Sequence, residues 1–99
     1  MTNVFIERLL ELKNGREVSV RFRQPERAFT DWQCTFEIDW PDRRCCRQIF
    51  GIDAIQALLL SMQVAHAELI ESPENASGEL TWLGGRDFDL PLLGSSMLG

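Results

Sequence analysis

The sequence predicts an α+β fold: an antiparallel four-stranded β-meander covered on one face by one long α-helix, followed by a short fifth strand. Two observations predict it. Apolar and polar residues alternate through much of the first half, as in strands with one buried face. Residues 52–72 then contain no glycine or proline and are rich in strong helix formers. A sheet with one apolar face needs a cover, and the helix supplies it.

The first two strands are predicted at residues 4–12 and 16–23, on either side of a three-residue loop. Gly15 takes the left-handed position that such a loop requires. This register sets Glu7 opposite Arg21, an attractive cross-strand pair. A two-residue loop would shift one strand by a residue and turn its apolar side chains to the wrong face, so we prefer the longer loop.

The third and fourth strands are predicted at residues 32–40 and 44–50, after a connection at residues 24–27. The third strand alternates cleanly between apolar and polar residues. A three-residue turn then opposes Trp40 to Arg44. In this register Cys46 points to the core and Cys45 points to solvent, between two arginines that would lower its pKa.

The predicted helix runs from Ile52 to about Ser72, with Asp53 in its first turn or at its N-cap, and Pro73 ends it. On a helical wheel the main apolar stripe faces the sheet and comprises Ile52, Ile55, Leu58, Leu59, Met62, Ala65, Leu69 and Ile70. A second, smaller patch comprises Ala57, Leu60, Val64 and Ala67. A helix that is apolar on two sides is covered on two sides, here by the C-terminal tail, a second subunit or a partner protein.

A fifth strand is predicted at residues 79–83, and Gly84-Gly85 ends it. No repeat or linker divides the chain, so residues 1–85 form a single α+β domain. Residues 86–99 form a C-terminal tail, which we expect to be partly mobile.

The formal net charge of −5 is unevenly distributed. Residues 1–50 carry nine basic and eight acidic side chains, whereas residues 51–99 carry one basic and seven acidic ones. Acidic chains are repelled by phosphate backbones, so we expect no direct nucleic-acid binding. The chain shows no membrane-spanning apolar run and no secretory signal. We therefore expect a cytoplasmic protein with reduced thiols.

Candidate chemical groups are few: three cysteines and one histidine, His66. Their spacing matches neither a disulfide framework nor a zinc site, so we expect no metal and no cofactor. His66 lies at the margin of the main helical stripe, without a predicted catalytic neighbour. Arg8 falls on the apolar face of the sheet. It either extends to the sheet edge, which we favour, or pairs with an acidic residue of the helix or tail.

The stretch Phe50-Gly51-Ile52-Asp53-Ala54-Ile55-Gln56-Ala57-Leu58, with Thr81-Trp82-Leu83-Gly84 further on, resembles a family of small bacterial proteins catalogued as a domain of unknown function. The resemblance covers most of the chain, up to Gly85. It implies a shared fold and a bacterial origin, with Gly51 freeing the turn into the helix and Trp82 filling the core. It implies no activity.

These observations predict a small, acidic, non-catalytic protein-binding module, for example an immunity or antitoxin-like inhibitor of a basic, nuclease-like or other nucleic-acid-handling partner. The candidate partner-binding residues are Leu60, Val64, Ala67, Glu68, Glu71, Glu74, Asp87 and Asp89. One alternative is a homodimeric structural or accessory protein joined through the second apolar patch. Another is small-molecule binding or catalysis in a pocket between helix and sheet, near His66 and Arg8.

Overall fold

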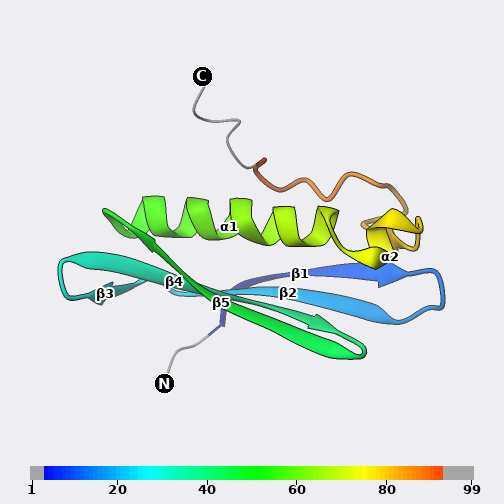
Figure 1. The fold of residues 1–99 in the computed structure, drawn as a ribbon, viewed down its shortest axis with the longest axis horizontal. Helices are drawn as coiled ribbons and strands as arrows, with labels where there is room; N and C mark the ends of the chain where they lie inside the picture. The colour runs from blue at the N-terminus through cyan, green and yellow to red at the C-terminus, as the bar shows by residue number, and fades with distance from the viewer. Residues whose placement is uncertain (1–3, 93–99) are drawn as a thin grey trace.

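The computed structural model describes residues 4–92, which form one antiparallel sheet and a helical layer (Figure 1). In chain order the elements are β1 (Val4–Leu12), β2 (Glu17–Arg23), β3 (Glu26–Ala28), β4 (Asp31–Trp40), β5 (Arg43–Gly51), α1 (Ala54–Ile70), α2 (Pro73–Ala76) and β6 (Leu80–Thr81). β4 is central: it pairs with β5 on one side and with β2 and β3 on the other. β1 extends the sheet from β2, and β6 extends it from β1.

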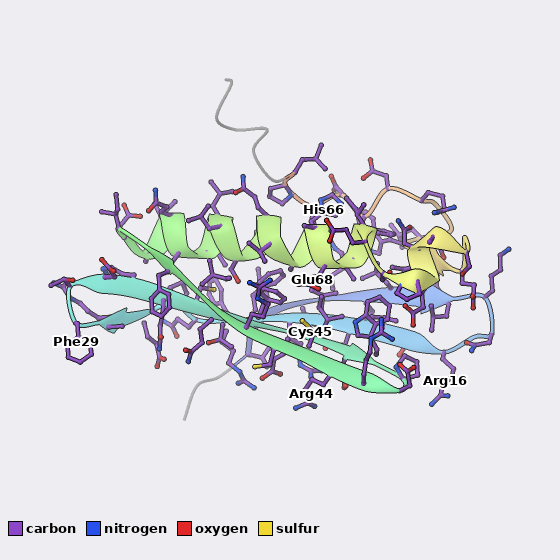
Figure 2. All side chains as sticks on the ribbon, in the orientation of Figure 1. Arg16, Phe29, Arg44, Cys45, His66 and Glu68 are labelled. Carbon is purple, nitrogen blue, oxygen red and sulfur yellow. The ribbon has the colours of Figure 1, made fainter. Side chains whose placement is uncertain are left out.

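The predicted α+β class is confirmed, and α1 lies across one face of the sheet (Figure 1). The predicted number of strands was too small, because β3 falls where a connection was expected. The hairpin between β3 and β4 turns at Phe29, which has a positive φ of 54° and a fully exposed side chain (Figure 2). Such turns normally carry glycine or asparagine at this position, and a phenylalanine there does not indicate a turn.

The register predicted for the first hairpin is confirmed. Glu7 lies opposite Arg21, and the Leu12 N–H donates to the Arg16 carbonyl at 2.8 Å. Gly15 has a φ of 88°, the left-handed conformation that the three-residue loop requires.

The register predicted for the next hairpin was wrong by one residue. Trp40 pairs with Arg43 rather than Arg44, because the turn contains two residues instead of three. A shift of one residue moves every side chain of a strand to the opposite face. Cys45 therefore lies on the helix side, beside the core, and Cys46 is exposed on the other face.

The helix α1 begins where an acidic N-cap was expected. The Asp53 carboxylate accepts a hydrogen bond from the Gln56 N–H at 2.8 Å, which satisfies one of the free donors of the first turn. At the other end, Pro73 occupies the first turn of α2, a short helix capped by Ser72.

The predicted core stripe of α1 was only partly right. Ile52 and Ile55 are 78% and 77% exposed, and Leu59 and Ile70 are also exposed. The face toward the sheet is instead built largely from smaller residues, and its fully buried members are Ala57, Ser61, Ala65 and Leu69. Large sheet residues such as Phe36 fill the space beneath, so the helix approaches closely through small side chains.

The core lies between sheet and helix, and the tail contributes to it. Phe88 is buried beside Leu69 and Leu80 in the same cluster. Residues 86–92 therefore pack on the domain, while residues 93–99, the rest of the predicted tail, lie outside the described residues. β6 is shorter than the predicted fifth strand and pairs with the end of β1. Within residues 4–92, no helix is both long and apolar enough to cross a membrane.

Candidate partner-binding surface

Leu60, Val64 and Ala67 form a row along α1 between β5 and the tail, and Ala67 lines a hollow with His66, Ile70, Glu71 and the tail residue Leu92. At 100° per residue they fall on the same side of the helix as Glu68, which accepts a hydrogen bond from Arg47 of β5 at 3.0 Å. Leu60 and Ala67 are half-buried, and Val64 packs against the edge of the core. We call these three residues with Arg47 and Glu68 the α1–β5 flank. Figure 2 shows Glu68 pointing from α1 toward β5.

Two of the predicted acidic contacts already have partners within the chain. Glu74 of α2 accepts two hydrogen bonds from Arg43, at 2.9 and 3.0 Å, and this arginine also lies 4.4 Å from the centroid of the Trp40 ring. The hydrogen bonds from Arg43 lower the pKa of the Glu74 carboxyl below its usual range. Glu68 is engaged by Arg47. Neither arginine partner was predicted, because the register predicted for β5 was wrong by one residue and set its arginines on the wrong faces.

The other three acidic candidates are exposed. Glu71 caps the C-terminus of α1 through its backbone, which leaves its side chain in solvent. Asp87 and Asp89 lie on the tail, where the Asp87 carboxylate accepts the N–H of Asp89 at 2.9 Å. The structure thus brings Leu60, Val64, Ala67 and Glu68 together, places Glu74 at the far end of α1 with α2, and puts the two aspartates on a different segment.

Arg8 holds the tail against β1. Its guanidinium donates to the carbonyls of Phe88 and Asp89, at 2.8 and 2.7 Å, and lies 4.2 Å from the centroid of the Trp82 ring. Of the two roles considered for Arg8, it therefore pairs with the tail, but through main-chain carbonyls and not through an acidic side chain. Nothing in the sequence pattern indicated this contact, because it joins residues about 80 positions apart.

His66 faces the same tail segment. Its Nδ1 lies 3.1 Å from the Pro91 carbonyl, and its ring meets the Phe88 ring edge-on at a centroid distance of 6.0 Å. A hollow of about 270 Å³ remains nearby, lined by Ile6, Glu7, Arg8, Phe22, Met62 and Leu90. The tail therefore occupies much of the space that a helix–sheet pocket would need.

The face of the sheet opposite α1 carries a network of charges. Glu37 of β4 is buried at 7% exposure and accepts hydrogen bonds from Arg23, at 2.9 and 3.2 Å, and from Arg21 at 3.3 Å. The hydrogen bonds from Arg23 contribute most to lowering the pKa of the Glu37 carboxyl. Arg21 also approaches Glu7, the partner predicted for it, at 3.9 Å. These pairs join three neighbouring strands.

The thiols of Cys34 and Cys45 both have raised pKa values. Burial raises the pKa of the Cys34 thiol, and the nearby Ser61 hydroxyl offsets part of that shift. Burial and the charge of Glu68 raise the pKa of Cys45, which corrects the expectation that neighbouring arginines would lower it. In the part of the chain that the structure describes, no three histidine, cysteine or acidic side chains gather as metal ligands would.

A second apolar region lies around the start of α1. Phe5, Trp32, Ile55 and Leu58 line a shallow hollow of about 270 Å³ together with Gln24, Pro25 and Ala54. The residue shift in β1 between Val4 and Ile6 accompanies the approach of Phe5 to this side of the sheet. The helical wheel predicted Ile55 to face the core, so this exposed region was not predicted from the sequence.

Together these features define, within residues 4–92, a small sheet-and-helix domain with a half-buried apolar row along one side of the helix and a second apolar region at its start. The chain belongs to the family described as a domain of unknown function, DUF6968, whose model matches residues 6–92. No curated protein and no solved structure matches the chain significantly. The resemblance stated from the sequence is thereby confirmed at the level of the family, and the match extends beyond Gly85 to include the tail residues that pack on the core.

Proposed function

We propose that this chain is a small, non-catalytic protein-binding module that contacts its partner through the α1–β5 flank. The observation that carries the proposal is the half-buried apolar row of Leu60, Val64 and Ala67 beside a charged pair, Arg47 and Glu68. Apolar side chains rimmed by charged ones are typical of surfaces that become buried in a complex.

A basic partner, such as the target of an immunity or antitoxin-like inhibitor, is a more specific form of this proposal. It draws support from Glu71, Asp87 and Asp89, which are exposed. It draws little from Glu68 and Glu74, because each is already neutralised by an arginine of β5. The proposal therefore rests on the apolar row more than on the acidic charge.

A homodimer through the same apolar row is the alternative that uses the same observation. Light scattering separates the two, because the homodimer gives a mass that rises with concentration and the binding module gives a monomer. A ligand pocket between Arg8 and His66 has less support, since both side chains are engaged by the tail.

The test is affinity capture of partners from a lysate of the source organism, with a matched pair of variants. Leu60→Asp places a charge in the apolar row, and Leu83→Asp makes the same change at an exposed residue of a turn elsewhere. We expect a protein that the wild type and Leu83→Asp both retain and that Leu60→Asp loses. Equal retention by both variants, or no protein retained above background, would refute the proposal.

A further inference from the structure

The strand β5 forms an open edge of the sheet beside the α1–β5 flank. It runs from Arg43 to Gly51 and, within residues 4–92, pairs only with β4. Its register against β4 continues without a bulge, and it contains no proline. Figure 1 shows β5 crossing in front of β4, with no other strand beyond it. Such a long, regular edge keeps a complete row of backbone groups available for pairing.

The positions of the free backbone groups follow from the turn. In a two-residue hairpin the flanking residues, Trp40 and Arg43, exchange both of their backbone hydrogen bonds, and the direction then alternates along the strand. The residues of β5 that direct N–H and C=O away from β4 are therefore Arg44, Cys46, Gln48 and Phe50. Their side chains lie on the face opposite α1, as Figure 2 shows for Arg44.

We propose that β5 binds an extended segment of a partner protein as an additional strand of the sheet. This inference rests on the proposed function and names its mode of binding. The occupant follows from chemistry: a row of donors and acceptors at strand spacing is complementary only to another extended backbone. The charge of β5 selects among strands, because it carries three arginines and no acidic residue of its own, although Glu74 and Glu68 already pair with two of these arginines. A second copy of β5 adds three more arginines to this edge and sets Arg47 opposite Arg47 in one of its registers, whereas a neutral or acidic segment avoids this repulsion in every register.

The two faces of the added strand meet different surroundings. On the helix side the added strand would meet Cys45 and Ile49, which border the core, and also Arg43 and Arg47, which already pair with Glu74 and Glu68. Apolar residues therefore suit the positions beside Cys45 and Ile49. On the opposite face it would meet Arg44, whose side chain is 57% exposed and has one long contact, of 3.7 Å, with Asp39. An acidic residue beside Arg44 gains a partner. The inferred segment thus combines apolar residues with acidic or neutral ones.

The experiment uses a phage-displayed library of random 12-residue peptides selected on the full chain. Gln48→Pro removes an outward N–H at the middle of the edge and leaves the β4 ladder intact, while Gln48→Ala is its matched control. We expect enriched peptides that combine apolar and acidic residues. By fluorescence polarisation they should bind Gln48→Ala within about twofold of the wild type and Gln48→Pro at least about tenfold more weakly.

Thermal unfolding confirms that Gln48→Pro is folded, and Arg44→Glu provides a second variant if it is not. Arg44→Glu should weaken acidic peptides by a similar factor and leave neutral ones almost unchanged. Peptides that bind all variants equally, or a selection that enriches none, would overturn strand addition. Self-association of the wild type that Gln48→Pro abolishes would assign the edge to a second copy instead. A partner from the lysate that Leu60→Asp loses but Gln48→Pro retains would support the protein-binding module and contradict strand addition at β5.

Discussion

At the scale of single residues, Ser61 is a core position where polarity and burial conflict. Its hydroxyl is fully buried on the sheet-facing side of α1 and, among residues 4–92, makes no hydrogen bond of good geometry; its polar neighbour is the Cys34 thiol, a weak hydrogen-bonding group. A buried hydroxyl without a strong partner loses the hydration that it has in the unfolded chain. Its small size, however, suits the close approach of helix and sheet, so the position favours a small residue and does not require a polar one.

Ser61→Ala is therefore expected to stabilise the protein by about 1 kcal/mol, since alanine nearly keeps the volume, removes the poorly paired hydroxyl and favours helix. The measurement is the free energy of unfolding in urea. Ser72→Ala is the matched control. Ser72 is also buried, but its hydroxyl donates to the Leu69 carbonyl at 2.7 Å and accepts from Asn75, so its loss should cost about 1 kcal/mol. Destabilisation by both changes would contradict this account.

The free energy of unfolding should depend on pH through the carboxyl group of Glu37. Since Arg23 and Arg21 lower its pKa, the folded state binds a proton less readily than the unfolded chain, where a glutamate has a pKa of about 4.3. Its contribution is complete above that pH and is lost as the pH falls through the folded value. We expect Glu37→Gln to cost about 1–3 kcal/mol at pH 7 and to flatten the decline of the unfolding free energy as the pH falls below about 5. Glu26→Gln, at an exposed site, should keep the wild-type profile of unfolding free energy against pH.

At the scale of elements, predictions from the sequence succeeded where a local signal fixed the geometry. Gly15 specified the loop of the first hairpin, and with it the register of β1 against β2. No such signal marked the next turn, where proline and aspartate suit loops of more than one length, and the register was wrong. The prediction of the buried residues of α1 was partly wrong for another reason. Helical periodicity points to the large apolar residues, but the close approach of the helix to the sheet requires small ones such as Ala57.

The candidate surface was predicted only in part. Helical spacing grouped Leu60, Val64 and Ala67, but it wrongly included Ala57, which is fully buried on the face toward the sheet. The arginine partners of Glu68 and Glu74 could not be predicted, because they depend on the register of β5. The Arg8 contacts with the tail join opposite ends of the chain and leave no periodic trace in the sequence.

The junction between β5 and α1 requires a residue without a side chain at Gly51. A Cβ there would lie 2.5 Å from the backbone nitrogen of Ala57, and the backbone of α1 cannot yield easily. We expect Gly51→Ala to destabilise the protein by about 2 kcal/mol or more, measured by urea unfolding. Gly85→Ala is the control, because its Cβ would meet its nearest atom at an ordinary 3.7 Å. Equal tolerance of both substitutions would contradict the close approach.

The tail segment depends on Arg8. Arg8→Met keeps the aliphatic stem but removes the donors to the carbonyls of Phe88 and Asp89, so it should cost about 1–3 kcal/mol. Hydrogen exchange should then accelerate in residues 86–92, while the β1–β2 hairpin stays protected. Arg16→Met, on the exposed loop side of that hairpin, should leave the exchange of the tail unchanged. Unchanged hydrogen exchange of residues 86–92 in Arg8→Met would contradict the role of Arg8 in holding the tail.

At the scale of the whole molecule, the two long sides of the sheet differ. On the β1 side, β6 pairs with the end of the strand and the tail is held along it by Arg8. On the β5 side, the described residues leave the strand edge and the flank of α1 uncovered together. Two arginine–glutamate pairs brace this side against α1 and α2, so the exposed surface is held in a fixed shape. A preorganised surface loses less conformational freedom when it binds.

The measurement that tests the account most directly is hydrogen exchange of the chain alone and in complex with the partner that affinity capture identifies. The account predicts slower exchange in two segments, β5 from Arg43 to Gly51 and the helical stretch from Leu60 to Ala67, with the tail and the β1–β2 hairpin unchanged. Protection confined to residues 86–92 or to the β1–β2 hairpin would contradict it, because the partner would then bind the opposite side of the molecule.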